Sequence, residues 1–135
     1  MMRTQLISLA VGVFTLLALA TRANAHAFMV HAEPRVGSKV KKAPTEVRIW
    51  FSESVQPALS SIKVFDEKGT QVDKKNTHLD RDNRALLDVS LTPDLALGTY
   101  RVIWRVTSID THITNGDFRF QVVATQRAAV SSPQN

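Results

Sequence analysis

The chain has 135 residues, a formal net charge of +5 at pH 7 and no cysteine. Without cysteine it can form neither a disulfide nor a thiolate metal site, and cysteine catalysis is excluded. Its basic residues are scattered along the sequence rather than clustered, so nucleic acid is not an expected partner. No nucleophile–base pair and no glycine-rich phosphate loop stands out, so no motif favours an enzyme.

Residues 1–25 have the pattern of a cleavable secretory signal peptide. Arg3 supplies the positive charge, an apolar run follows, and Ala-Asn-Ala at 23–25 forms a small-x-small cleavage site. An uncleaved membrane anchor is the alternative, but the apolar run of about 15 residues is shorter than the roughly 20 that a span requires. Cleavage after Ala25 would remove two arginines and no acid, which leaves residues 26–135 with a net charge of +3. We therefore expect an exported, periplasmic protein.

The remaining chain alternates polar and apolar residues in short runs, which is the period-2 pattern of half-buried strands. Prolines and turn residues lie between the runs, where a missing N–H costs no hydrogen bond of a sheet. The predicted strands cover residues 46–51, 61–65, 85–91, 99–106 and 117–122. No segment of useful length has helical periodicity. We predict an all-β sandwich over residues 26–123 and a disordered tail over 124–135.

Tyr100 supports the sandwich. It follows a Leu-x-x-Gly turn that ends at Gly98, and it stands at the start of a predicted strand. In the tyrosine corner of immunoglobulin-like domains, a tyrosine at such a position bonds through its hydroxyl to upstream backbone. The alternative is a tyrosine on an ordinary strand.

Cleavage after Ala25 would make His26 the first residue of the mature chain. Its free α-amine and its imidazole Nδ1 could then close a six-membered chelate ring on one metal ion. An internal histidine cannot do this, because its backbone nitrogen belongs to an amide. His26 is therefore the first candidate metal ligand.

Asp110 and His112 are candidates for the rest of the site. They lie two residues apart just after the predicted strand 99–106, so in an extended backbone both point to the same face. Taken alone, such a pair is as consistent with loop residues or with a simple carboxylate–histidine hydrogen bond. With His26, the pair offers three nitrogens and one oxygen, which suits a tetragonal Cu(II) ion, whereas Zn(II) favours a tetrahedral site. Cu(I) prefers soft thioethers, and Met29 is the only methionine left after cleavage.

The other polar candidates have weaker patterns. His31 follows His26 by five residues, and this odd offset predicts that the two face opposite ways in a regular strand. His78 lies in a polar, charged stretch and is predicted to be a loop histidine. Glu53 follows the predicted strand 46–51 and is either an outer-shell partner of the metal or a carboxylate at the rim.

A string of motifs runs in order from His26 to about Val123. Its members are His-Ala at 26–27, Glu-Pro at 33–34, VRIWFSE at 47–53, LGTYRV at 97–102, WRVTSIDTH at 104–112 and GDFRF at 116–120. This string resembles the CopC-type periplasmic copper-binding proteins of copper resistance. The match is fairly specific because it covers nearly the whole mature chain.

The resemblance implies a Greek-key β-sandwich of the immunoglobulin-like, cupredoxin-like kind. It implies one Cu(II) ion per chain, bound by the amine and imidazole of His26 and by Asp110 and His112. The implied role is a monomeric copper carrier or buffer for copper homeostasis and resistance, with an inner-membrane partner of the CopD type as the recipient. This chain departs from the family in two ways: Thr111 replaces the usual glycine between the Asp and the His, and the methionine-rich loop of members with a Cu(I) site is missing.

Two other functions fit parts of the pattern. An N-terminal histidine with a second histidine also resembles the histidine brace of copper mono-oxygenases, but those enzymes are usually larger and leave open the position that Asp110 would fill here. The third function is a metal-free exported interaction module. Adding one residue before His26 distinguishes the copper-binding hypothesis from the metal-free module, because the addition would affect only a copper site that uses the α-amine.

Overall fold

The computed structural model describes residues 26–125. The proposed signal peptide and all of the proposed tail except Ala124 and Thr125 lie outside the described residues. The elements are β1 (Met29–Glu33), β2 (Lys39–Val40), β3 (Glu46–Phe51), the 3₁₀ turn η1 (Pro57–Leu59), β4 (Ser61–Phe65), β5 (His78–Leu79), β6 (Leu86–Ser90), β7 (Gly98–Thr107) and β8 (Ile113–Val122).

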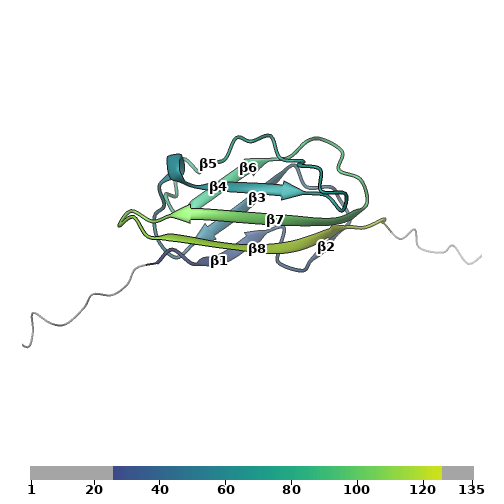
Figure 1. The fold of residues 1–135 in the computed structure, drawn as a ribbon. Helices are drawn as coiled ribbons and strands as arrows, with labels where there is room; N and C mark the ends of the chain where they lie inside the picture. Colours follow the sequence, from purple (N-terminus) through teal and green to yellow (C-terminus); the bar gives the residue numbers. More distant parts are fainter. Residues whose placement is uncertain (1–25, 126–135) are drawn as a thin grey trace, which may run out of the picture.

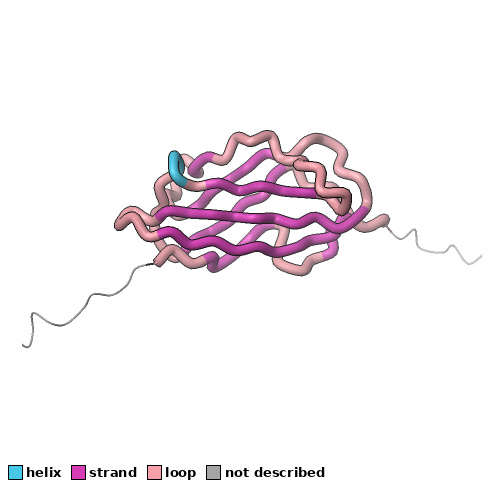
Figure 2. The backbone as a smooth tube through the Cα atoms, in the orientation of Figure 1, coloured by secondary structure: helices cyan, strands magenta, loops and turns pink. Residues whose placement is uncertain are grey.

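The strands form two four-stranded sheets that pack face to face (Figure 1). The first sheet has the order β1-β3-β6-β5 and the second the order β2-β8-β7-β4. Only β2 and β8 pair in parallel; the other neighbours in the described sheets are antiparallel. Figure 2 shows strands in both layers and a single short helical turn among the described residues. The predicted all-β sandwich is confirmed.

Within residues 26–125, no helix has the length and apolar character needed to cross a bilayer.

Alternation along the strands builds the core between the sheets. In β3, Val47 and Ile49 are fully buried while their neighbours are partly or fully exposed, because successive side chains of a strand point to opposite faces. Val102 of β7 is likewise fully buried between partly or fully exposed neighbours. Each fully buried side chain of this size stabilises the fold by roughly 1.5–3 kcal/mol.

The predicted strand 117–122 is too short. In the structure β8 begins at Ile113, because residues 113–117 pair with the second half of β7. The first part of β8 has no fully buried residue, so hydrophobic alternation could not reveal it. This longer β7–β8 hairpin carries the turn that holds Asp110 and His112.

The tyrosine corner is confirmed. The Tyr100 hydroxyl donates a hydrogen bond of 2.7 Å to the carbonyl of Ala96, and its ring stacks on Phe120 at a centroid distance of 5.3 Å. Burial, with smaller contributions from the charges of Asp66 and Glu67, raises the pKa of Tyr100, so the hydroxyl remains a donor through the neutral range.

Tyr100→Phe should therefore lower the free energy of unfolding by about 1 kcal/mol, since it removes one intramolecular hydrogen bond and leaves the Ala96 carbonyl without that donor. The measurement is urea unfolding of the two proteins side by side. A lower midpoint with an unchanged slope supports the corner, and an unchanged midpoint would contradict it.

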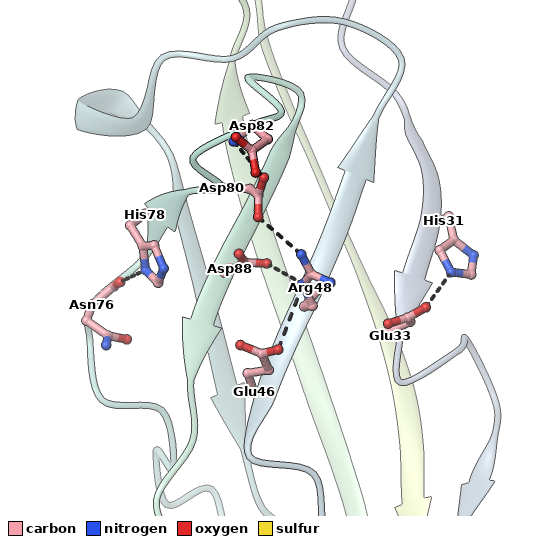
Figure 3. Close-up of polar contacts among 9 residues, drawn as sticks. All are labelled: His31, Glu33, Glu46, Arg48, Asn76, His78, Asp80, Asp82 and Asp88. Atoms are coloured by element: carbon pink, nitrogen blue, oxygen red, sulfur yellow. Dashed lines mark hydrogen bonds and ion pairs between the residues drawn. The ribbon is translucent and has the colours of Figure 1, made fainter.

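An ion cluster covers the outer face of the first sheet (Figure 3). The Arg48 guanidinium lies 3.0 Å from Asp88, 3.3 Å from Asp80 and 3.9 Å from Glu46, and 5.0 Å from the Trp50 ring centroid. The hydrogen bond to Asp88 is the main reason that the pKa of Arg48 is raised. Arg48 thus remains charged and forms ion pairs with acids from β3, β6 and the segment that follows β5.

Candidate metal centre

Asp110 and His112 lie in the turn between β7 and β8. Ser108 and His112 close this turn through a hydrogen bond of 2.9 Å from the Ser108 N–H to the His112 carbonyl, and Thr111 N–H donates to Ser108 at 3.0 Å. The backbone is therefore a tight turn, and the condition of an extended backbone, under which the two side chains would share a face, is not met. The two side chains still meet, because the turn brings His112 Nδ1 to 2.9 Å from Asp110 Oδ2.

The Asp110 carboxylate is hydrogen-bonded through both oxygens. The buried Ser108 hydroxyl donates to Oδ1, and His112 bonds to Oδ2. These contacts, the Ser108 bond first, lower the pKa of Asp110 below its ordinary value, so the group is ionised at neutral pH. A metal ion on His112 Nε2 would leave this bond intact and make Asp110 an outer partner, whereas a metal ion that takes both side chains as ligands would replace the bond.

Thr111 has a φ of +70°, in the left-handed region that a β-branched residue rarely adopts. Such a conformation costs on the order of 1–3 kcal/mol and persists when surrounding contacts impose it. Here the hydrogen bonds that close the turn at Ser108 impose it. The turn therefore keeps the geometry that glycine adopts freely, although the residue is threonine.

Thr111→Gly should raise the free energy of unfolding by about 1 kcal/mol, because relief of the backbone strain exceeds the greater entropy of glycine in the unfolded chain. Chemical denaturation measures the change. A destabilised Thr111→Gly protein would show that the side chain, whose hydroxyl bonds to the Asp110 carbonyl, matters more than the strain.

The first described residues are fixed by contacts to both sheets. Ala27 is fully buried, and its carbonyl accepts a hydrogen bond of 2.6 Å from the Thr114 hydroxyl of β8. Ser52, just after β3, donates through its hydroxyl to the His26 carbonyl at 3.2 Å and accepts from the Phe28 N–H at 2.9 Å. The His26 backbone is thus held beside the β7–β8 turn.

His26 and His112 consequently lie together. Their ring centroids are 4.7 Å apart and the rings meet edge to face. Nevertheless, among residues 26–125 no three His, Cys, Asp or Glu side chains are grouped so that they could hold a metal ion. The structure pairs His26 with His112, and His112 with Asp110, but does not preassemble the three side chains. A further nitrogen would come from the α-amine of His26, which is an amide in the uncleaved chain.

The remaining histidines lie on the outer face of the first sheet (Figure 3). His31, in β1, bonds to Glu33 at 3.3 Å and packs against Trp50 at a centroid distance of 4.9 Å. His78 is not a loop residue as predicted: it forms β5 with Leu79, and its Nδ1 lies 2.8 Å from the Asn76 carbonyl. The pairing of β5 with β6 converts this polar stretch into a strand, and local sequence does not report that pairing.

Glu53 has an unusual position near the end of β3. Its Oε1 is buried and has no hydrogen-bond partner within the described part of the chain. A buried carboxylate oxygen is costly to leave without a partner. The burial of Oε1 is inconsistent with a simple carboxylate at the rim.

Sequence reasoning missed the three hydroxyl residues that position the site. Ser52 and Thr114 fix the backbone of residues 26–28, and Ser108 fixes Asp110 and the turn. Ser108 stands inside the segment that was singled out, so its spacing of two from Asp110 was a usable signal. The contacts of Ser52 and Thr114 join distant parts of the chain and leave no local pattern.

A comparison with protein families shows to which family the chain belongs. The family model described as the CopC domain matches residues 29–123. The chain belongs to the CopC family. Copper transport protein CutJ of Bacillus subtilis (strain 168) is 35% identical over 98 residues, which make up 73% of this chain and 18% of CutJ. The CopC resemblance identified from the motifs is confirmed.

Two solved structures share the CopC fold. CopC from Methylosinus trichosporium OB3b has a TM-score of 0.69 and 34% sequence identity, over 76% of this chain and 99% of that one. PcoC, a methionine-rich copper resistance protein from Escherichia coli, has a TM-score of 0.65 and 27% identity, over 73% of this chain and 100% of that one. The CopC domain of this chain therefore belongs to a family with members named for copper resistance and copper transport.

Proposed function

We propose that the chain, once cleaved after Ala25, binds one Cu(II) ion through His26, Asp110 and His112. His26 provides its α-amine and its imidazole, and the β7–β8 turn provides the other two side chains. The observation that carries the proposal is the 4.7 Å separation of the His26 and His112 rings, since the two residues are far apart in the sequence. Cleavage would add the amine to a place where two imidazoles already meet.

Asp110 can bind the metal without losing its role in the turn, because Oδ1 keeps the hydrogen bond from Ser108. Oδ2 and His112 Nδ1 lie 2.9 Å apart, so the two atoms converge on one point. A Cu(II) ion bound there would replace the proton between them and take both atoms as neighbouring ligands.

The donor set supports Cu(II) over other ions. Three nitrogens and one oxygen suit a tetragonal Cu(II) site. Thiolates are excluded because the chain has no cysteine, and Met29 is the only thioether after cleavage. PcoC, by contrast, is described as methionine-rich. A site that stores Cu(I) is therefore not part of the proposal.

As a function, we infer a periplasmic carrier or buffer of Cu(II) that acts as a monomer in copper homeostasis and hands the ion to an inner-membrane partner of the CopD type. The names of CutJ and PcoC, for copper transport and copper resistance, support a carrier. The same names favour a carrier over a histidine-brace oxidase. Asp110 also argues against the oxidase, because it would fill a coordination position that such an enzyme leaves open.

Two measurements on the exported protein test this function. Mass spectrometry should find His26 as the first residue, and a competition titration against a Cu(II) chelator should end at one ion per chain. A different first residue, or no binding in competition with the chelator, would contradict the proposal. Sustained oxidation of a substrate by the copper-loaded protein with a reductant would favour the oxidase instead.

A further inference from the structure

The outer face of the second sheet gathers basic side chains that are far apart in the sequence. Alternation turns every second residue of its strands outward, and the strand register places these residues next to one another. The exposed members, called the basic face below, are Lys39 of β2, Lys63 of β4, Arg101 and Arg105 of β7, and Arg119 of β8. Figure 1 views this sheet from its outer side, with β4, β7 and β8 in front. The basic residues are thus scattered in sequence but clustered in space.

The charge of the basic face is largely uncompensated. Asp117 is the only outward-facing acid on the described strands of this sheet, and it pairs with Arg101 at 2.9 Å. Within residues 26–125 the other four basic side chains have no ion pair. Moreover, Arg101 and Arg119 are direct cross-strand partners, and like charges in this position destabilise a sheet. An anionic partner would relieve that repulsion.

The opposite face has the reverse character. On the first sheet, Glu46, Asp80 and Asp88 surround Arg48, and three carboxylates around one guanidinium leave excess negative charge (Figure 3). Among the described strands, the basic side chains without an ion pair therefore all lie on the outer face of the second sheet. Because Asp80 and Asp88 are only 27% and 9% exposed, they present little of this charge to the basic face of a second copy. An asymmetric charge distribution of this kind orients a molecule on an anionic surface.

We propose that the basic face docks the domain on an anionic phospholipid bilayer. The face is a broad sheet surface: Arg101 and Arg105 lie about 13 Å apart along β7, and the flanking basic residues on β4 and β8 lie about 10 Å apart across it. Such a spread matches a plane of many phosphates better than one bound phosphate. The backbone of β7 is paired on both sides, so a peptide cannot add to it as a strand. The guanidinium groups suit phosphate oxygens because they donate in a fork.

A pocket of about 510 Å³ lies at one end of the basic face, and within the membrane contact it could receive the headgroup of one lipid. Arg101, Arg119 and Phe65 are among its lining residues. Two acids also line it, but Asp66 accepts backbone N–H groups of its own turn, and Glu67 accepts the Thr99 N–H at 2.8 Å. Their charges are thereby partly engaged.

Apolar side chains border the other end of the basic face. Leu59 and Ile113 are 57% and 52% exposed, and both line a pocket with Arg105 beside the β7–β8 turn. Exposed apolar side chains next to cations are typical of surfaces that lie in the interface of a bilayer. In this orientation the turn with Asp110 and His112 lies at the margin of the membrane contact. None of the docking side chains is a proposed copper ligand, so the proposal does not depend on the metal.

Vesicle flotation of the metal-free chain beginning at His26 tests the docking. We expect it to float with vesicles of phosphatidylcholine and phosphatidylglycerol but not with phosphatidylcholine alone, and the bound fraction should fall as salt rises. Each basic residue near an anionic surface increases binding roughly five-fold, so Arg105→Gln with Arg119→Gln should weaken it about 25-fold. The matched control is Arg81→Gln with Arg84→Gln, which removes the same charge from exposed positions in the segment between β5 and β6 and should retain most of the binding.

Four outcomes would overturn the proposal. Equal flotation with neutral vesicles would point to apolar binding alone, and equal losses in the two double variants would show that only net charge matters. Displacement by inorganic phosphate at matched phosphate concentration would indicate a site for a single anion. Sedimentation could show that the chain is a dimer and that the Arg105→Gln, Arg119→Gln variant is a monomer. The basic face would then be an interface between copies. Circular dichroism of both variants confirms that they are folded.

Discussion

One residue added before His26 should lower the Cu(II) affinity of the processed chain by more than about 100-fold. The addition converts the α-amine into an amide and so removes one of the proposed ligands together with its chelate ring. Loss of an outer-shell partner alone typically lowers metal affinity 10–100-fold, and loss of a direct ligand should exceed that. The His26 imidazole remains, and the contacts of Ala27 with β8 are untouched, so the fold should not change. Competition with a chelator measures the affinity.

The control is the same residue added after Asn135, which changes length and composition equally and should leave the affinity unaltered. If the chain extended before His26 binds Cu(II) as tightly as the processed chain, the amine is not a ligand. The metal would then be held by side chains alone. Absence of Cu(II) binding by both chains would instead indicate the metal-free interaction module.

His112→Asn should also lower the Cu(II) affinity by more than about 100-fold. This substitution removes the imidazole that lies 4.7 Å from the His26 ring and is oriented by Asp110, while asparagine can still donate a hydrogen bond to that carboxylate. Titration of both proteins with Cu(II) against a chelator gives the ratio of their affinities.

The chain supplies matched controls for this substitution. His31→Asn and His78→Asn change the same residue type on the outer face of the first sheet, where each histidine has a partner of its own, Glu33 or Asn76. Both should leave the affinity within about two-fold. A loss in either control comparable to that of His112→Asn would contradict the placement of the site beside the β7–β8 turn.

Much of the fold could be predicted because its strands are amphipathic. Buried and exposed residues alternate in β3 and β4, and Tyr100 marks the corner before β7, so local patterns were sufficient there. The start of β8 and the strand that contains His78 could not be predicted in this way. Both depend on pairing with the adjacent strand of a hairpin, and pairing energy does not appear in the hydrophobic pattern of one segment.

The residues of the candidate site could likewise be predicted from the sequence, but their arrangement could not. His26, Asp110 and His112 could be selected from the sequence, since a cleavage site and a D-x-H triplet are local signals. The geometry could not: the turn is tight rather than extended, and Thr111 adopts a left-handed conformation that its residue type disfavours. The contacts of Ser52 and Thr114 that position His26 join segments far apart in the chain. Hydrogen bonds within the turn determine the first arrangement, and tertiary contacts determine the second.

Electron paramagnetic resonance of the processed chain with one equivalent of Cu(II) tests the central claim most directly. The account predicts a single tetragonal signal with hyperfine coupling to three nitrogens, one of which is lost when a residue is added before His26. A signal without coupled nitrogens, or one that the added residue leaves unchanged, would contradict the claim that the mature N-terminus binds the copper.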